Sequence, residues 1–205
     1  MRSDLLMVGL LSVAWCVMHS GLISRTVDAW LLKRLGAKYA FVRLGYVVSS
    51  TAGFAVVLWY AGRLEAATLF RWEGTWAVAR WTGLAAGLAV FFLGTRVYNN
   101  YYFLGFRQIR KYFRGVDPPR PVFRVSGILR YIRHPYYTAT ILLLVFMSDV
   151  TDVNAVWRSV FLVYTVVGTL LEERKLAAEF GDRYLRYKRE VPMYLPWKWL
   201  KGKLR

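Results

Sequence analysis

The sequence predicts an all-α polytopic membrane protein with five transmembrane helices, on three observations. The 205-residue chain is 57% hydrophobic and 17% aromatic, which is too apolar for a soluble domain of this size. It contains several nearly uncharged runs that are long enough, or almost long enough, to cross a bilayer. Its basic residues gather between those runs, as they do in loops that face the cytoplasm.

The predicted spans follow the apolar runs in chain order. They are residues 5–24, 44–62, 74–95, 134–148 and 153–171. Arg80 and Arg158 are the only charges inside them. The fourth run is about 22 Å long as a helix, short of a hydrocarbon core of about 30 Å. Because only residues 149–152 separate the last two runs, we expect these to form a helical hairpin.

The distribution of lysine and arginine orients the predicted helices. Segments 24–43, 96–133 and 174–205 hold 24 basic residues, and the loops on the other side hold only four. The positive-inside rule then places the N-terminus outside and the C-terminal tail in the cytosol. The net charge of +17 alone could suggest nucleic-acid binding. Its interleaving with apolar runs favours membrane lipids as partners, and no nucleic acid.

The length of the chain favours a single membrane domain over residues 1–205. The proline-rich run 117–121 divides it into an N-terminal three-helix part, 1–113, and a C-terminal part, 120–200. Residues 98–113 either extend the third helix or lie along the membrane surface. We expect an integral protein of a bacterial or archaeal inner membrane. The single Cys16 lies in an apolar run and cannot form an internal disulfide, so no oxidising compartment is implied.

The predicted hairpin brings two distant groups of reactive residues to one membrane face. The fourth helix begins at His134, and the fifth returns to the same face at Glu172 and Glu173. Carboxylates at a helix C-terminus oppose the helix dipole, so this pair favours a functional role over a solvated helix end. His134 precedes Pro135, which keeps it out of the helical region, and either a cap or a binding role fits it.

Other chemistries have little support in the sequence. His19 lies inside the first span, where a hydrogen bond to a neighbouring helix accounts for it best. With two histidines and one cysteine, no zinc-type metal site is expected. The chain contains no glycine-rich phosphate-binding fingerprint and no serine-hydrolase elbow.

Two strings near the C-terminus resemble the membrane-integral methyltransferases, which include isoprenylcysteine carboxyl methyltransferases and phospholipid methyltransferases. The first string is Arg133-His134-Pro135-x-Tyr137. The second runs from Glu172-Glu173 through Phe180-Gly181, Tyr184, Tyr187 and Val191-Pro192 to Pro196. The match covers about residues 120–200, while the N-terminal helices match only in general character.

The resemblance implies S-adenosylmethionine as cofactor, in a pocket facing the cytosol. The cofactor-binding residues that it implies are Gly127, Leu129, His134, Pro135, Tyr137, Glu173, Tyr184 and Tyr187. The catalytic residues that it implies are Arg133, Glu172, Glu173 and Arg189. We assign His19 and Glu190 to the acceptor. Many carboxyl methyltransferases carry arginine where this chain has Glu190, which weakens the case for a carboxylate acceptor.

The sequence therefore predicts methyl transfer from S-adenosylmethionine to a lipophilic or membrane-partitioning acceptor. A lipid head group, a thiol, an amine and an isoprenylcysteine-like carboxylate all remain open as acceptors. The alternatives are an NADPH-dependent membrane sterol or enone reductase, and a non-enzymatic membrane protein of the same fold.

Overall fold

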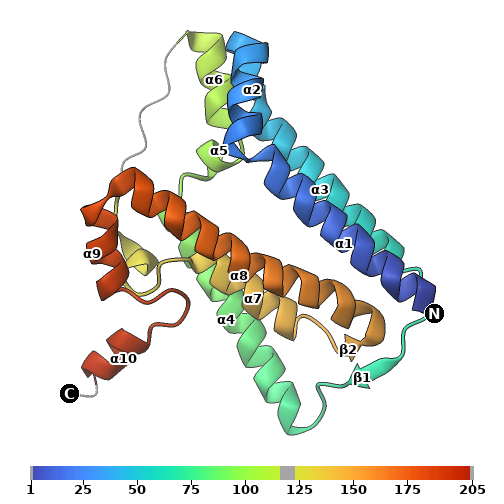
Figure 1. The fold of residues 1–205 in the computed structure, drawn as a ribbon. Coiled ribbons are helices and arrows are strands. Elements are labelled where there is room, and N and C mark those ends of the chain that lie inside the picture. The colour runs from blue at the N-terminus through green and yellow to red at the C-terminus, as the bar shows by residue number, and fades with distance from the viewer. Residues whose placement is uncertain (1, 116–122, 204–205) are drawn as a thin grey trace. The chain divides into compact units, whose positions relative to one another are not determined.

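The computed structural model describes residues 2–115 and 123–203 and consists mainly of helices (Figure 1). The chain forms two compact units. The first unit comprises Met1–Ala67, Asn99–Pro121 and Thr151–Phe161, and the second comprises Thr68–Tyr98, Val122–Val150 and Leu162–Arg205. The units therefore alternate along the chain.

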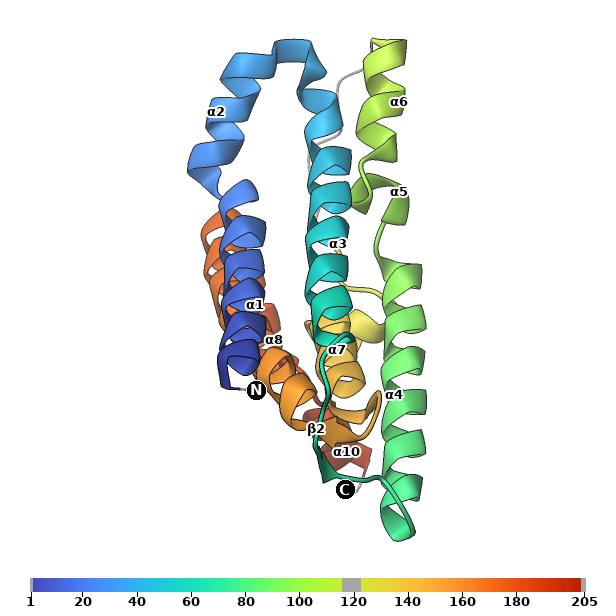
Figure 2. The same ribbon diagram turned by 90° about the vertical axis from the view of Figure 1, so that its right-hand side faces the viewer.

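The first unit contains the helices of the N-terminal residues and two short helices further along. These are α1 (Arg2–Leu22), α2 (Arg25–Leu35), the 3₁₀ helix η1 (Gly36–Phe41), α3 (Val42–Ala61), α5 (Asn100–Phe103) and α6 (Phe106–Arg114). Helices α1 and α3 lie side by side in both views (Figures 1 and 2). Trp15 joins them, because its indole N–H donates to the carbonyl of Ser50 at 2.8 Å. Gly53 leaves room for the indole, since a Cβ there would lie 2.9 Å from Trp15 Cδ1.

The second unit contains the residues of both C-terminal strings. Its elements are β1 (Thr68–Phe70), α4 (Thr75–Val97), the 3₁₀ helix η2 (Gly127–Arg130), α7 (Pro135–Phe146), α9 (Asp182–Glu190) and α10 (Trp197–Lys203). The strand β2 (Val150–Thr151) and the helix α8 (Asp152–Phe180) connect the two units along the chain. Strands β1 and β2 form a small sheet that was not predicted.

Helices α4 and α7 pack closely because glycine lines the contact face of α4. The buried glycines are Gly83, Gly87 and Gly94. A Cβ on Gly83 would lie 2.3 Å from the ring of Phe146, and a Cβ on Gly94 would lie 3.1 Å from the ring of Tyr136. Small residues at such spacing let apolar helices approach closely, as in membrane helix pairs. This packing holds the start of α7 against the end of α4.

The predicted apolar spans correspond to helices, but the helix of the fourth span is short. Within residues 2–115 and 123–203, four helical stretches are long and apolar enough to cross a membrane: α1, the continuous stretch Arg25–Ala61, α4 and α8. Helix α7 has 12 residues and is shorter. The prediction of an all-α membrane protein is therefore confirmed, while the count of five spans and their orientation stay predictions.

Residues 98–113 were expected either to extend the third helix or to lie along the membrane surface, and the structure excludes the first of these. Helix α4 ends at Val97, and Tyr98 has extended backbone with ψ 147, so residues 98–113 do not continue that helix. They form α5 and α6, separated by Gly105. The predicted proline-rich division at 117–121 lies outside the described residues, and the division into 1–113 and 120–200 stays a prediction.

Candidate active site

The C-terminal tail folds back along the residues that precede α7. The backbone N–H of Arg133 donates to the carbonyl of Pro192 at 3.0 Å, and that of His134 donates to the carbonyl of Met193 at 3.2 Å. This pairing is possible because α9 ends before Val191, whose backbone is extended with ψ 130. The two strings that the sequence singled out are therefore adjacent in space, within one unit.

Arg133 and Glu173 form a buried ion pair at the centre of this contact. Arg133 Nε lies 2.7 Å and Nη2 lies 2.5 Å from Glu173 Oε1. The Nη1 group donates to the carbonyls of Lys188 and Val191. The two side chains are only 6% and 2% exposed. The guanidinium therefore joins α8 to the C-terminal tail, and little of it is exposed to solvent.

Three further side chains surround the Glu173 carboxylate. His134 Nε2 lies 3.2 Å from Oε1, and the Tyr184 hydroxyl donates to the same oxygen at 3.5 Å. Lys188 Nζ lies 2.7 Å from Oε2, an ion pair that is not aligned as a hydrogen bond. A buried carboxylate needs partners of this kind, because desolvation of an isolated charge is very costly. These contacts indicate that Glu173 stabilises the packing of the C-terminal tail against α8.

His134 is buried rather than exposed at the start of α7. It occupies the N-cap position of α7 with φ −125 and ψ 67, and its side chain makes no capping hydrogen bond. Burial lowers the pKa of His134, while the nearby carboxylates of Glu172 and Glu173 act in the opposite direction. Of the two roles left open for it, the structure therefore excludes side-chain capping.

The two predicted tyrosines of α9 point into the protein. Tyr184 is 1% exposed and Tyr187 is 8% exposed. The Tyr187 hydroxyl donates to the carbonyl of Leu129 at 2.6 Å, and the Phe123 ring packs against both tyrosine rings. Burial raises the pKa of both hydroxyls, which therefore stay protonated at neutral pH. The pair connects α9 to the segment that leads into α7.

Glu172 differs from its neighbour because it is only half-buried. Its negative charge acts on His134 and, after the effect of desolvation, helps to raise the pKa of Tyr98. Tyr98 stacks on Tyr136 with ring centroids 5.0 Å apart and an interplanar angle of 23°. A carboxylate with access to solvent therefore lies near a pair of stacked aromatic rings. The expectation that Glu172 and Glu173 stand at a helix C-terminus is wrong, because α8 continues to Phe180 and both residues lie inside it.

The remaining predicted residues of this region divide into two groups. Pro135 is buried at the first position of α7, and the ring of Tyr137 lies 5.7 Å from that of His134. Gly127 has a positive φ of 49°, and a Cβ there would lie 2.7 Å from Val97 Cγ1, so packing accounts for it. Arg189 and Glu190 are exposed at the end of α9, away from the buried ion pair.

His19 belongs to a separate cluster in the first unit. Its Nε2 lies 2.5 Å from the Tyr46 hydroxyl, which is the expected hydrogen bond to a neighbouring helix. The Trp15 ring packs on His19 with centroids 4.7 Å apart, and the guanidinium of Arg43 lies 5.1 Å from the Tyr46 ring centroid. The cluster thus links the C-terminal end of α1 to the N-terminal end of α3.

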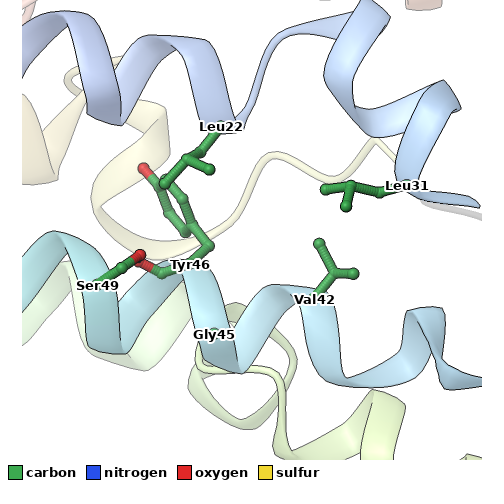
Figure 3. A pocket seen from close by; sticks show the side chains of 6 residues that line it. All are labelled: Leu22, Leu31, Val42, Gly45, Tyr46 and Ser49. Carbon is green, nitrogen blue, oxygen red and sulfur yellow. The ribbon is translucent and has the colours of Figure 1, made fainter. Parts of the chain in front are cut away.

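Tyr46 also lines a pocket of about 230 Å³ (Figure 3). The side chains of Leu22 and Leu31 lie on one side of it and those of Val42 and Tyr46 on the other (Figure 3). Gly45 and Ser49 complete the lining. The pocket is small for a ligand site and mainly apolar, with one hydroxyl that is hydrogen-bonded to His19.

Several residues of the candidate site were not predicted from the sequence. Tyr98 and Lys188 carry no motif signal, since their roles depend on contacts with residues 38 and 15 positions away, Tyr136 and Glu173. Tyr136 lay inside the first string and could have been included with it. Tyr194 has a buried hydroxyl with no hydrogen-bond partner among the described residues.

Curated relatives of this chain share one enzymatic class. Methanethiol S-methyltransferase from Crocosphaera subtropica is 26% identical over 92% of this chain and 73% of its own length. Methanethiol S-methyltransferase 1 from Bradyrhizobium diazoefficiens is 26% identical over 92% of this chain and 66% of its own length. The protein of that name from Mycobacterium tuberculosis is 25% identical over 89% of this chain and 74% of its own length. This chain therefore spans about two thirds to three quarters of its relatives.

These relatives, the apolar helices and the buried site confirm the class that the two strings indicated, that of the membrane-integral methyltransferases. The model of the NnrU protein family matches residues 6–194, so the chain belongs to that family. No solved structure matches the chain. The alternative of a nicotinamide-dependent reductase gains no support from these comparisons.

Proposed function

We propose that this protein transfers a methyl group from S-adenosylmethionine to a small, apolar thiol. The acceptor class is supported by the relatives, which are named for methanethiol and whose matches extend over about nine tenths of this chain. The observation that carries the proposal is the arrangement of Glu172, His134 and the Tyr98–Tyr136 pair around the buried Arg133–Glu173 ion pair.

The residues of this site fit the chemical groups of the cofactor. A carboxylate that is open to solvent, Glu172, suits an ammonium or sulfonium group, and aromatic faces such as those of Tyr98 and Tyr136 attract cations. The buried, unpartnered hydroxyl of Tyr194 is a further polar atom that a bound group would satisfy. It lies in the segment that pairs with the start of α7, where Thr138 Oγ1 donates to the Tyr194 carbonyl at 3.2 Å.

The side chains of the site would act mainly by binding and orientation. When bound, S-adenosylmethionine supplies an electrophilic methyl group on a positively charged sulfur. Glu172 and the stacked tyrosines would hold that positive charge, while Arg133 and Glu173 would keep the tail and α7 in place as positioning residues. Because methyl transfer is an in-line displacement, the geometry that these residues maintain would contribute a large part of the rate enhancement.

We also propose that the chain has the membrane orientation predicted from its basic residues. With the N-terminus outside and the C-terminus inside, the starts of α7 and α9 would face the cytosol of a bacterial or archaeal cell. This orientation is supported by the excess of basic residues in segments 24–43, 96–133 and 174–205. A water-soluble cofactor would then enter from the cytosol, and an apolar acceptor could enter from the bilayer.

We propose His19 as a residue that affects use of the acceptor, through its hydrogen bond to the Tyr46 hydroxyl.

Binding and turnover measurements test the main proposal. Calorimetry on the full chain in detergent should detect S-adenosylhomocysteine binding and no binding of NADPH. Incubation with S-adenosylmethionine and methanethiol should release dimethyl sulfide into the headspace. The absence of S-adenosylhomocysteine binding at millimolar concentration would refute the methyltransferase proposal, whereas binding without dimethyl sulfide would refute only the acceptor.

A further inference from the structure

Helix α6 places its cationic and its apolar side chains on different faces. The cationic residues are Arg107, Arg110, Lys111 and Arg114, which are three or four positions apart and therefore share one face. Phe106, Ile109 and Phe113 follow the same spacing on the other face. Phe106 is 49% exposed and Phe113 is 75% exposed, so much of the apolar face is not covered within the described chain.

The four cationic side chains line an open hollow of about 300 Å³ on the surface of α6. Among the described residues, no carboxylate forms an ion pair with Arg107, Arg110 or Arg114. Like charges at these spacings repel one another, so an anion in the hollow would relieve the repulsion. The dipole of the helix accounts for cations in its last turn, but not for Arg107 in its first turn.

The position of α6 is set by contacts within the first unit. The Phe41 ring of η1 packs edge-on against Tyr112 and Phe113, with ring centroids 5.4 Å and 6.3 Å away. Gly105 begins the helix with φ 92°, and a Cβ there would lie 2.7 Å from the backbone N of Leu44. Glycine is needed at this position both for its conformation and for the close approach. The cationic face is therefore presented by an anchored helix that directly adjoins the start of α3.

We propose that α6 binds the phosphate of an anionic phospholipid, with its apolar face in the acyl region and its cationic face at the head group. The occupant follows from charge and polarity together. The three arginines have no carboxylate partner among the described residues and suit a phosphate, and the exposed aromatic side chains on a different face of the helix suit hydrocarbon. A free phosphate ion satisfies the first face only. The chain spans a membrane, so a lipid supplies both groups at once.

Native mass spectrometry of the full chain in an uncharged detergent tests this site. The chain is mixed with dioleoylphosphatidylglycerol or dioleoylphosphatidylcholine, and the bound lipids are counted. We expect preferential retention of phosphatidylglycerol, with the preference falling about fivefold for each cation removed. The test variant replaces all four cations of α6 with glutamine. The control replaces Arg25, Lys33, Arg34 and Lys38 with glutamine, which removes the same charge from α2 and η1.

Loss of the preference in the α6 variant, with its retention in the control, supports the proposal. Equal loss in both variants would overturn it in favour of a general attraction by net charge. Full competition by inorganic phosphate at equal concentration would also overturn it, because the acyl chains would then contribute nothing. If the fourfold variant does not fold, Arg107→Gln/Lys111→Gln should lose part of the preference, and an unchanged preference there would refute the site. Arg107→Lys/Arg110→Lys/Arg114→Lys should keep it.

Discussion

Glu172 and Glu173 are adjacent in sequence, yet they occupy different environments. Successive residues on a helix are rotated by about 100°, so only one of two neighbours can face a given partner. Glu173 faces Arg133, Lys188 and Tyr184 and is 2% exposed, while Glu172 is half-buried. One carboxylate of the pair thus holds the tail in place, and the other can reach a ligand.

Removal of the buried charge should mainly reduce stability. In Glu173→Gln the guanidinium of Arg133 stays buried without its counter-ion, which typically costs about 3–5 kcal/mol. We expect unfolding in detergent at a correspondingly lower denaturant concentration, with loss of all ligand binding at the temperature where the tail detaches. A variant as stable as the parent chain would show that the ion pair does not anchor the tail.

Glu172→Gln should have the opposite profile. We expect its free energy of unfolding to stay within about 0.5 kcal/mol of the parent value, because a half-buried carboxylate without a buried counter-ion contributes little. Its affinity for S-adenosylhomocysteine should fall about tenfold or more, since a hydrogen bond to a charged group is lost. Calorimetry measures the affinity of Glu172→Gln and of Glu173→Gln for S-adenosylhomocysteine. Unchanged affinity in Glu172→Gln would show that this carboxylate does not belong to the cofactor site.

His134 should make the stability of the protein depend on pH. Burial lowers its pKa below the ordinary value of 6.5, so the unfolded chain takes up a proton more readily than the native one. The stabilisation is complete above pH 6.5 and is lost as the pH falls below that value. We expect the midpoint of thermal unfolding to fall between pH 7 and pH 5, and to fall less in His134→Gln. Parallel curves for the two proteins would contradict a neutral, buried His134.

At the scale of elements, contact between helices depends on where the small residues lie. Gly83, Gly87 and Gly94 allow α4 to meet α7, and Gly94 lies against Tyr136, which stacks on Tyr98. The packing of two apolar helices therefore brings the aromatic pair of the candidate site together. Apolar periodicity predicted both helices, but glycine in an apolar run is ambiguous until the facing side chain is known.

Two alanine substitutions separate packing from helix propensity. Gly83→Ala would place its Cβ 2.3 Å from the Phe146 ring, so we expect a net loss of about 1–3 kcal/mol from overpacking. Gly45→Ala meets open space, and we expect a gain of up to about 1 kcal/mol from helix propensity alone. Unfolding in mixed micelles measures both. A gain in stability for Gly83→Ala would show that α4 and α7 can separate without cost.

At the scale of the whole molecule, charge asymmetry is the property that bears on orientation. The 24 basic residues of segments 24–43, 96–133 and 174–205 include all four cations of α6. Such a distribution favours retention of these segments in the cytosol. The same residues would then meet an anionic leaflet, which links the orientation to the lipid site on α6.

Reporter fusions test the orientation of the whole chain. Green fluorescent protein fused after Arg205 should fluoresce, because it folds in the cytosol, and alkaline phosphatase fused there should be inactive. Alkaline phosphatase fused after Glu65 should be active. The reverse pattern would place the candidate site outside the cell and would contradict entry of the cofactor from the cytosol.

Much of this protein follows from local properties of its sequence. Hydropathy and length determine the apolar helices, since transfer of apolar residues into a bilayer depends mainly on local composition. The spacing of the two strings determined the class, and the turn at 149–152 predicted that His134 and the Glu172–Glu173 pair meet. The tertiary structure alone decided which carboxylate is buried, that Lys188 pairs with it and that Tyr98 joins the site. These contacts join residues from different helices, and they depend on helix rotation and packing, which no local pattern encodes.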